Sequence, residues 1–124
     1  MIVVDSSGWI EYIFGRPNVA FFRPAIHDLD NLLVPTIALA EVIRYVTRAA
    51  GRNAAQTAAT QMRRAIVVSL DADLADLAAR LGLKHNLPMA DAVVYATAQA
   101  HKATLLTQDE DFAKLPGVRY VRKK

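Results

Sequence analysis

The feature that most constrains the fold is a regular alternation between short β-rich apolar runs and longer segments with helical periodicity. The apolar runs are Ile2–Val4, Leu32–Val34, Ile66–Val68, Thr104–Leu106 and Val118–Val121. The first four are continuous, as in strands covered on both faces, whereas the fifth contains Arg119 and is typical of an edge or late strand. This alternation predicts an α/β fold with a mostly parallel sheet of about five strands.

Helical patterns fill the intervals between these runs. They extend from Ser6 or Ser7 to about Phe14, from Pro17 toward Asp30, from Thr36 to Ala50, from Asn53 to Arg64, from Asp71 to about Gly82, and from Met89 to about Lys102. Pro24 is expected to bend or split the second of these helices. Its neighbours Phe21 and Phe22 fit either a core role or a surface that meets a partner.

Composition narrows the class of protein. With 124 residues, 53% of them hydrophobic, the chain is expected to form one domain over residues 1–124. The absence of cysteine excludes disulfides, thiolate zinc sites and a cysteine nucleophile. No charge-free apolar stretch reaches the length of a membrane span, and the N-terminus lacks the features of a signal peptide, so we expect a cytoplasmic protein without membrane contact.

Four carboxylates stand at chemically informative positions. Asp5 directly follows the first predicted strand, and Asp109 comes just after the fourth. Glu41 and Asp91 lie inside helical patterns where apolar or small residues are expected. In open α/β sheets, functional groups gather beyond the carboxyl ends of the strands. The four acids are therefore candidates for a single site.

Each acid also has an ordinary structural explanation. Asp5 can cap the following helix, Glu41 can pair with a residue one turn on, and Asp91 can favour a helix dipole. Asp109 or Asp111 can cap the segment around Phe112. A single shared site explains all these positions together better than four separate coincidences do.

If the acids converge, they require a cation. Two like charges about 6 Å apart repel by roughly 3 kcal/mol at an effective dielectric near 20. An all-oxygen site without cysteine or clustered histidine suits a hard ion, so Mg²⁺ or Mn²⁺ is the expected cofactor. Such ions activate water for attack on a phosphodiester and stabilise the departing oxygen.

The rest of the chain is basic. With the four acids set aside, eight acidic residues face 15 lysines and arginines, a formal charge of +7. Arg44, Arg48 and Arg52 recur at successive helical turns after Glu41, and the C-terminal tail adds further cations. These residues form either a solvated basic face or a surface for nucleic acid. On the second interpretation, Arg44 and Arg48 are candidate RNA-binding residues.

Four sequence blocks together resemble the PIN domain family, and more narrowly the VapC-type ribonuclease toxins of type II toxin–antitoxin systems. The blocks are Ile2–Ser7, Pro35–Glu41, Pro88–Ala92 and Leu105–Phe112. The resemblance spans essentially the whole chain. It implies a PIN-like three-layer α/β/α sandwich and metal-dependent endonucleolytic cleavage of RNA.

The resemblance also assigns roles residue by residue. Asp5, Glu41 and Asp91 match the three acids that hold the metal, and Asp109 matches a fourth, more variable one. Ser6 and Thr107 match the small hydroxyl residues that line the site. Asp111 belongs to the same motif as Asp109 and is expected to cap the next helix or to support the site. The family further implies a homodimer and a cognate VapB-type antitoxin whose C-terminal segment covers the acidic groove.

Two other classes of function remain as alternatives. A receiver-type phosphoacceptor domain has a similar length and an acidic magnesium pocket, but here no lysine in the required place follows a strand. A noncatalytic PIN-like binding module would retain the carboxylates only for recognition of a partner. The scattered His27, His85 and His101 do not favour a metal-free ribonuclease mechanism.

Overall fold

The computed structural model describes all residues 1–124 and contains one sheet of five strands, all paired in parallel. The strands are β1 (Ile2–Val4), β2 (Leu32–Pro35), β3 (Ile66–Val68), β4 (Thr104–Thr107) and β5 (Val118–Tyr120). Their spatial order is β3-β2-β1-β4-β5, which places β1 at the centre. The predicted parallel sheet is thus confirmed, including the edge position of β5.

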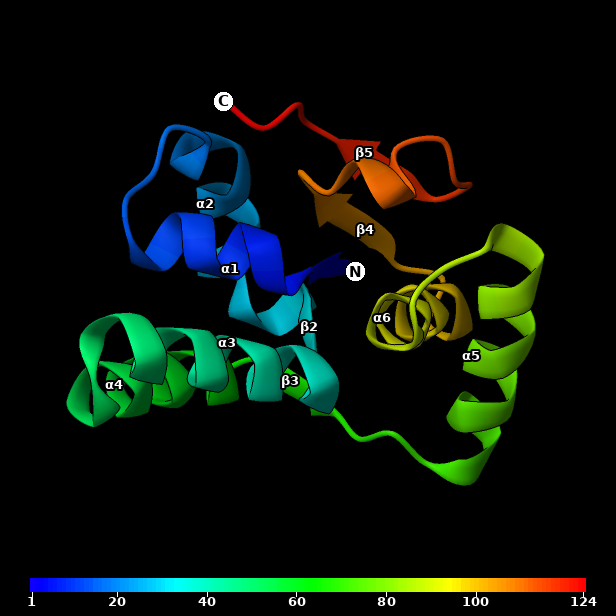
Figure 1. Ribbon diagram of the computed structural model, residues 1–124, viewed down its shortest axis with the longest axis horizontal. Helices are drawn as coiled ribbons and strands as arrows, with labels where there is room; N and C mark the ends of the chain where they lie inside the picture. The colour runs from blue at the N-terminus through cyan, green and yellow to red at the C-terminus, as the bar shows by residue number, and fades with distance from the viewer.

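Six α-helices cover the two faces of this sheet. They are α1 (Ser6–Ile13), α2 (Val19–His27), α3 (Thr36–Ala50), α4 (Arg52–Arg63), α5 (Ala72–His85) and α6 (Met89–Ala100), with 3₁₀ turns η1 (Leu29–Asn31) and η2 (Glu110–Phe112). Helices α1 to α4 lie on one side of the sheet, and α5 and α6 lie on the other (Figure 1). No helix is long and apolar enough to cross a membrane.

The side-chain alternation of β1 shows how the layers are held together. Val4 points into a core cluster shared with Trp9 and Phe22 of α1 and α2, whereas Val3 points into the opposite cluster with Val94 of α6. Both valines are fully buried. A central strand with apolar residues on both faces is what a three-layer α/β/α sandwich requires.

Two helices differ from the sequence prediction. Helix α2 begins at Val19 and continues through Pro24 to His27, so the proline does not split the helix. Helix α5 continues past Gly82 to His85 and ends at Asn86, which adopts a left-handed conformation. Gly82 serves close packing instead, because a Cβ there would lie 3.0 Å from the Cβ of Ala92 on α6.

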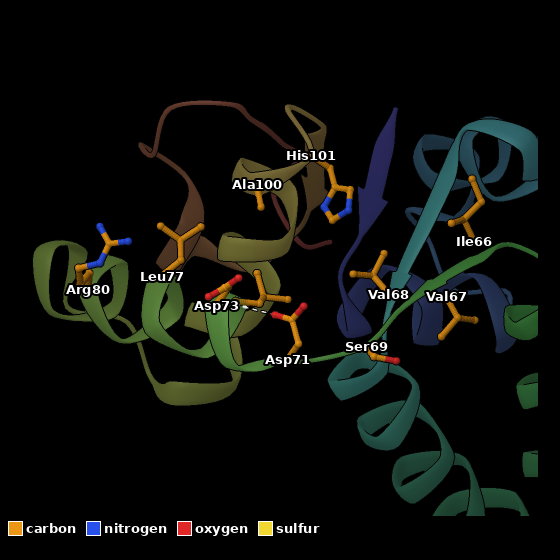
Figure 2. A pocket seen from close by; sticks show the side chains of 11 residues that line it. Ile66, Val67, Val68, Ser69, Asp71, Asp73, Leu77, Arg80, Ala100 and His101 are labelled. Atoms are coloured by element: carbon orange, nitrogen blue, oxygen red, sulfur yellow. Dashed lines mark hydrogen bonds between the residues drawn. The ribbon is translucent and has the colours of Figure 1, made fainter.

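Strand β3 was expected to be covered on both faces, and that expectation is wrong. It is an edge strand, and Ile66 and Val67 are 42% and 39% exposed. A hollow of about 690 Å³ lies beside it, with His101 at the end of α6 on its wall (Figure 2). This hollow lies at the opposite end of α6 from Asp91, so it is separate from the predicted site.

Candidate active site

The parallel sheet brings the predicted acids toward the edge that is formed by the carboxyl ends of its strands. In the register of β1 and β4, Val4 lies beside Leu106, so Asp5 and Thr107 follow at neighbouring strand ends. The backbone N–H of Asp5 donates to the carbonyl of Leu106 at 3.3 Å. Asp109 comes two residues after the end of β4. These positions follow directly from the rule that parallel strands end at a common edge.

Asp5 is 4% exposed and caps helix α1. Its Oδ1 accepts from the backbone N–H of Gly8 at 3.0 Å, and its Oδ2 accepts from the hydroxyl of Thr107 at 2.6 Å. The hydroxyl of Ser7 is shared between the two oxygens, at 2.8 Å from Oδ1 and 3.0 Å from Oδ2. The capping role considered as an alternative is therefore present. A carboxylate has about four lone-pair sites, so these three donors leave one for a further ligand.

Thr107 connects the two strand ends. Its side chain is fully buried, donates to Asp5, and accepts from the backbone N–H of Asp109 at 2.9 Å. Asp109 in turn caps η2, because its Oδ1 accepts from the backbone N–H of Asp111 at 2.9 Å. This chain of hydrogen bonds fixes the position of the Asp109 side chain relative to Asp5.

The tightest group of carboxylates consists of Asp91, Asp109 and Asp111. Each offers an oxygen, and these oxygens all lie within 4.8 Å of one another. Oxygens bound to one octahedral Mg²⁺ lie about 3.0 to 4.2 Å apart, given metal–oxygen distances of about 2.1 Å. Small side-chain rotations therefore suffice for these three acids to share an ion. Asp111, expected only as a cap or support, lies within this group.

Burial and mutual repulsion raise the pKa values of two of the acids. Burial raises the pKa of Asp5 to about 6, against the hydrogen bonds from Thr107, Gly8 and Ser7, which lower it. The pKa of Asp91 rises to about 7, first because of burial and then because of the negative charges around it. Those charges belong to Asp109, Glu41, Asp111 and Asp5. The acids thus interact electrostatically as one group, and this repulsion is what a bound cation would relieve.

Glu41 approaches the group from α3. It is half-buried, and its charge contributes to the raised pKa of Asp91. The alternative in which Glu41 pairs with a residue one turn on is not realised as an ion pair, because the structure's one salt bridge joins Arg80 to Asp76 on α5. Asp91 lies in the first turn of α6, where the helix dipole favours a negative charge, yet its pKa is raised, so burial and the neighbouring acids outweigh the dipole.

The remaining predicted residues lie around this group. Ser6 shares a hollow with Glu41, Arg44 and Arg48, and both arginines are exposed. Phe22 is fully buried in the core. The uncertain role of this aromatic residue is thereby resolved in favour of packing.

Sequence reasoning missed a buried polar network beside the acids. Glu11 of α1 is 1% exposed, and its carboxylate accepts from the backbone N–H of Asn18 at 2.8 Å and from the side-chain amide of Gln108 at 3.0 Å. Asn18 also donates to the side chain of Gln108 at 2.9 Å. Glu11 sits between apolar residues, as Glu41 does, so the same criterion could have found it. The network holds Gln108, which lies between Thr107 and Asp109 in the chain, in place.

Fold and acidic edge together define a class of protein. The chain matches the family model described as PIN domain over residues 2–118, and it belongs to the PIN domain family. The order of the strands also excludes the receiver-type alternative, because receiver domains have the order 2-1-3-4-5 and this sheet has the order 3-2-1-4-5. A comparison with curated proteins found no match to the chain.

Solved structures of toxins share this fold. Mycobacterium tuberculosis VapC20, described as a Sarcin-Ricin loop cleaving toxin, superposes with a TM-score of 0.81 at 22% identity, covering 99% of this chain and 100% of that one. A toxin–antitoxin complex from Klebsiella pneumoniae gives a TM-score of 0.80 at 22% identity, with 96% of each chain covered. DNA-bound VapBC from Salmonella typhimurium gives 0.78 at 15% identity, covering 98% of this chain and 96% of that one. At these identities the likeness shows the fold.

Proposed function

We propose that residues 1–124 form one nuclease domain that cleaves RNA endonucleolytically with Mg²⁺ or Mn²⁺. The observation that carries the proposal is the convergence of the Asp91, Asp109 and Asp111 carboxylates, whose oxygens lie within 4.8 Å of one another beside Asp5. Membership of the PIN domain family supports it. VapC20, which shares the fold, is itself described as a Sarcin-Ricin loop cleaving toxin, and this also supports the proposal.

Four acids are the proposed catalytic and metal-holding residues: Asp5, Glu41, Asp91 and Asp109. The oxygen-only donor set fits a hard dication, and Asp111 is close enough to join it. When bound, such an ion lowers the pKa of water and stabilises negative charge on a phosphodiester.

The chain's own residues contribute position and charge. Thr107 holds the Asp5 carboxylate through its hydroxyl and the Asp109 backbone through its oxygen, so both acids keep a fixed separation. Gly8 holds the other oxygen of Asp5, and the hydroxyl of Ser7 is shared between the two oxygens. Preorganised groups of this kind cost no reorganisation when charge develops in the reaction.

Cleavage of RNA by the purified protein tests this proposal. We expect total RNA to be cut with Mg²⁺ or Mn²⁺ but not with chelator, leaving 5′-phosphate and 3′-hydroxyl ends. Asp91→Asn and Asp5→Asn should each lose about 10²-fold or more in rate. Asp76→Asn, which changes an exposed carboxylate on α5, is the matched control and should cut as the wild type does.

Two outcomes would contradict the proposal. Cutting that persists in chelator, or that survives both substitutions, would show that the acids are not the active site. A wild-type protein that folds and binds RNA but never cuts it would favour the noncatalytic binding module.

The assembly is also part of the proposal. We propose a cytoplasmic toxin that forms a homodimer and is neutralised by a VapB-type antitoxin. The antitoxin is supported by a structure of the same fold that is described as a toxin–antitoxin complex. Leu83 and Met89 are 87% and 68% exposed and offer apolar surface for a partner. Light scattering of the purified chain tests the dimer, and co-purification with a co-expressed candidate VapB-type antitoxin tests the antitoxin. A monomer at micromolar concentration, or no stable complex, would contradict these two parts.

A further inference from the structure

Three segments that lie far apart in the chain meet at the side chain of Gln108. They are α1, the turn between α1 and α2, and the C-terminal tail, which runs toward α2 (Figure 1). The side-chain nitrogen of Gln108 donates to Glu11 at 3.0 Å, and its oxygen accepts from the side chain of Asn18 at 2.9 Å. Glu11, Asn18 and Gln108 are 1%, 3% and 5% exposed, so water has little access to replace these bonds.

Two backbone groups fix the direction of this network. At one end, the backbone N–H of Asn18 donates to Glu11 at 2.8 Å. At the other end, the backbone carbonyl of Arg122 accepts from the side-chain nitrogen of Asn18 at 3.0 Å. A backbone N–H can only donate and a carbonyl can only accept. The side-chain nitrogen of Asn18 must therefore face Arg122 and Gln108. As a result, the oxygen of Gln108 faces Asn18, and its nitrogen faces Glu11.

The side chain at position 11 consequently meets a donor at each of its two ends. Oε2 of Glu11 accepts from Asn18 and Oε1 accepts from Gln108. A carboxyl group offers two acceptors, whereas the nearly isosteric amide of glutamine offers one acceptor and one donor. If the amides of Gln108 and Asn18 both turned over to suit a glutamine, the oxygen of Asn18 would face the carbonyl of Arg122 and that bond would be lost. Only a carboxyl group at position 11 satisfies every group of the network.

The network bears on the proposed site through the backbone of Gln108, which lies in the chain between Thr107 and Asp109. Thr107 donates to Asp5 at 2.6 Å and accepts from the backbone N–H of Asp109 at 2.9 Å. Asp109 in turn accepts from the backbone N–H of Asp111 at 2.9 Å. A displacement of Gln108 would therefore move two of the three carboxylates whose oxygens lie within 4.8 Å of one another.

Helix α1 serves both strand ends that carry the acids. Asp5, which follows β1, caps the first turn of α1, and Glu11 of the same helix holds the segment that follows β4. The carbonyl of Ser7 in the first turn also accepts from the side-chain nitrogen of Gln108 at 3.5 Å. One rigid element thus sets the position of Asp109 relative to Asp5, as a preorganised site requires.

We propose that Glu11 is a positioning residue of the acidic site and acts through Gln108 on Asp109. Its carboxyl group touches neither substrate nor ion, and it keeps the segment after β4 at the distance from Asp5 at which the acids share an ion. Loss of an outer hydrogen-bond partner of a metal ligand typically costs about 10- to 100-fold in metal affinity. The inference rests on the proposed function in taking Asp109 as a metal-holding residue.

Glu11→Gln tests the proposal with almost no change in volume. In the metal-free protein, hydrogen exchange of the Asp109 amide, followed by NMR, should become at least about 5-fold faster because a buried bond of the network is lost. Affinity for Mn²⁺, measured by calorimetry at pH 8 and well below the Tm, should fall about 10-fold. A residue with only a structural role would lower the Tm without changing the affinity of the folded protein.

An exchange of the two side chains is the rescue variant. In Glu11→Gln with Gln108→Glu, the new amide at position 11 accepts from the backbone N–H of Asn18 and donates to the new carboxyl group at position 108. That carboxyl group still accepts from the side chain of Asn18. One bond reverses its direction, every bond is kept, and the net charge is unchanged. The double variant should recover the slow exchange of Asp109 and most of the lost Mn²⁺ affinity, a coupling that independent substitutions do not show.

Two further variants complete the test. Asp71→Ala is the matched control, because it removes a side-chain acceptor from the backbone N–H of Leu74 at the start of α5, outside the network. It should lower the Tm and speed exchange of the Leu74 amide, but leave Asp109 exchange and Mn²⁺ affinity unchanged. Asn18→Ala keeps the backbone N–H to Glu11 and loses both side-chain bonds. It should reproduce the pattern of Glu11→Gln, and it decides the question if Glu11→Gln does not fold.

Several results would overturn the positioning role. These are unchanged exchange at Asp109, exchange that accelerates equally throughout the chain, wild-type Mn²⁺ affinity in both network variants, or a double variant as impaired as Glu11→Gln alone. A wild-type protein that binds no Mn²⁺ would instead contradict the proposed function. Exchange in the metal-free protein would still decide whether Glu11 holds Asp109, so the two failures are distinguishable.

Discussion

Replacing Asp91 by asparagine is expected to stabilise the metal-free protein at pH 8, although it removes a residue of the proposed active site. The pKa of Asp91 rises from 3.8 to about 7 through burial and the surrounding acids. A shift of that size corresponds to a ceiling of about 4 kcal/mol. Because the side chain is only half-buried and solvent screens its charge, we expect about 2 kcal/mol.

The pH dependence follows from the direction of the shift. Between about pH 4 and pH 7 the folded protein holds a proton on Asp91 that the unfolded chain has released. The contribution of Asp91 to stability therefore falls as pH rises through this window and is constant above about pH 7. Asparagine does not titrate, so the advantage of the variant is near zero at pH 4 and largest at pH 8.

Thermal unfolding in chelator at pH 4 and pH 8, followed by circular dichroism, measures this difference. An increase of about 2 kcal/mol corresponds to roughly 8 °C in Tm for a chain of this length. Asp76→Asn is the control, because its exposed pair with Arg80 is expected to contribute less than about 0.5 kcal/mol. An Asp91→Asn variant that melts below the wild type at pH 8, or differs equally at both pH values, would refute the reasoning.

Three further predictions concern the same edge of the sheet. Affinity for Mn²⁺, measured by titration calorimetry, should fall steeply below about pH 7. The reason is that Asp91 and Asp5, with pKa values of about 7 and 6, must lose their protons to bind the ion. An affinity that does not change between pH 8 and pH 5 would contradict this. Thr107→Val should cost about 1 to 3 kcal/mol in urea unfolding, since it removes two buried hydrogen bonds at nearly equal volume, and a neutral effect would argue against the clip between the strands. Gly8→Ala should destabilise by about 1 to 3 kcal/mol, because the new Cβ would lie 2.6 Å from the ring of Phe22; a variant as stable as the wild type would mean that this ring moves freely.

The sequence predicted the sheet well because the strands carry a local signal. All five strands lie where apolar β-rich runs were found, and the parallel arrangement follows from the helices between them. Coverage of β3 was mispredicted because its residues, Ile66 to Val68, are as apolar as those of a central strand. Only the spatial order of the strands, which is a tertiary property, makes β3 an edge.

Helix ends were less predictable for a related reason. Gly82 has the residue type of a helix terminus, but it lies inside α5 because the close approach of Ala92 requires a residue without a side chain. Asn86, which ends the helix, carries a weaker signal. Pro17 was expected inside a first helical turn, yet the helix starts only after Asn18, whose backbone N–H is taken by Glu11.

The candidate site was partly predictable from position alone. Acids directly after strands or inside apolar helical runs identified the four candidates, and the structure brings their charges within reach of one another. Two features depend on the path of the chain after β4: the closeness of Asp111 to Asp91 and Asp109, and the hydrogen bond of Gln108 to Glu11. That path is fixed by hydrogen bonds that Thr107, Asp109 and Glu11 accept through their side chains, which no local pattern reveals.

The most direct test of the central claim is an anomalous difference map from crystals grown with Mn²⁺. We expect a peak about 2.0 to 2.5 Å from carboxylate oxygens of Asp91 and Asp109, with further oxygen ligands from the neighbouring acids or water. The peak should be absent from crystals of the Asp91→Asn variant. A wild-type map with no peak at this edge of the sheet, or with its peak elsewhere on the protein, would contradict the claim that these acids form a metal centre.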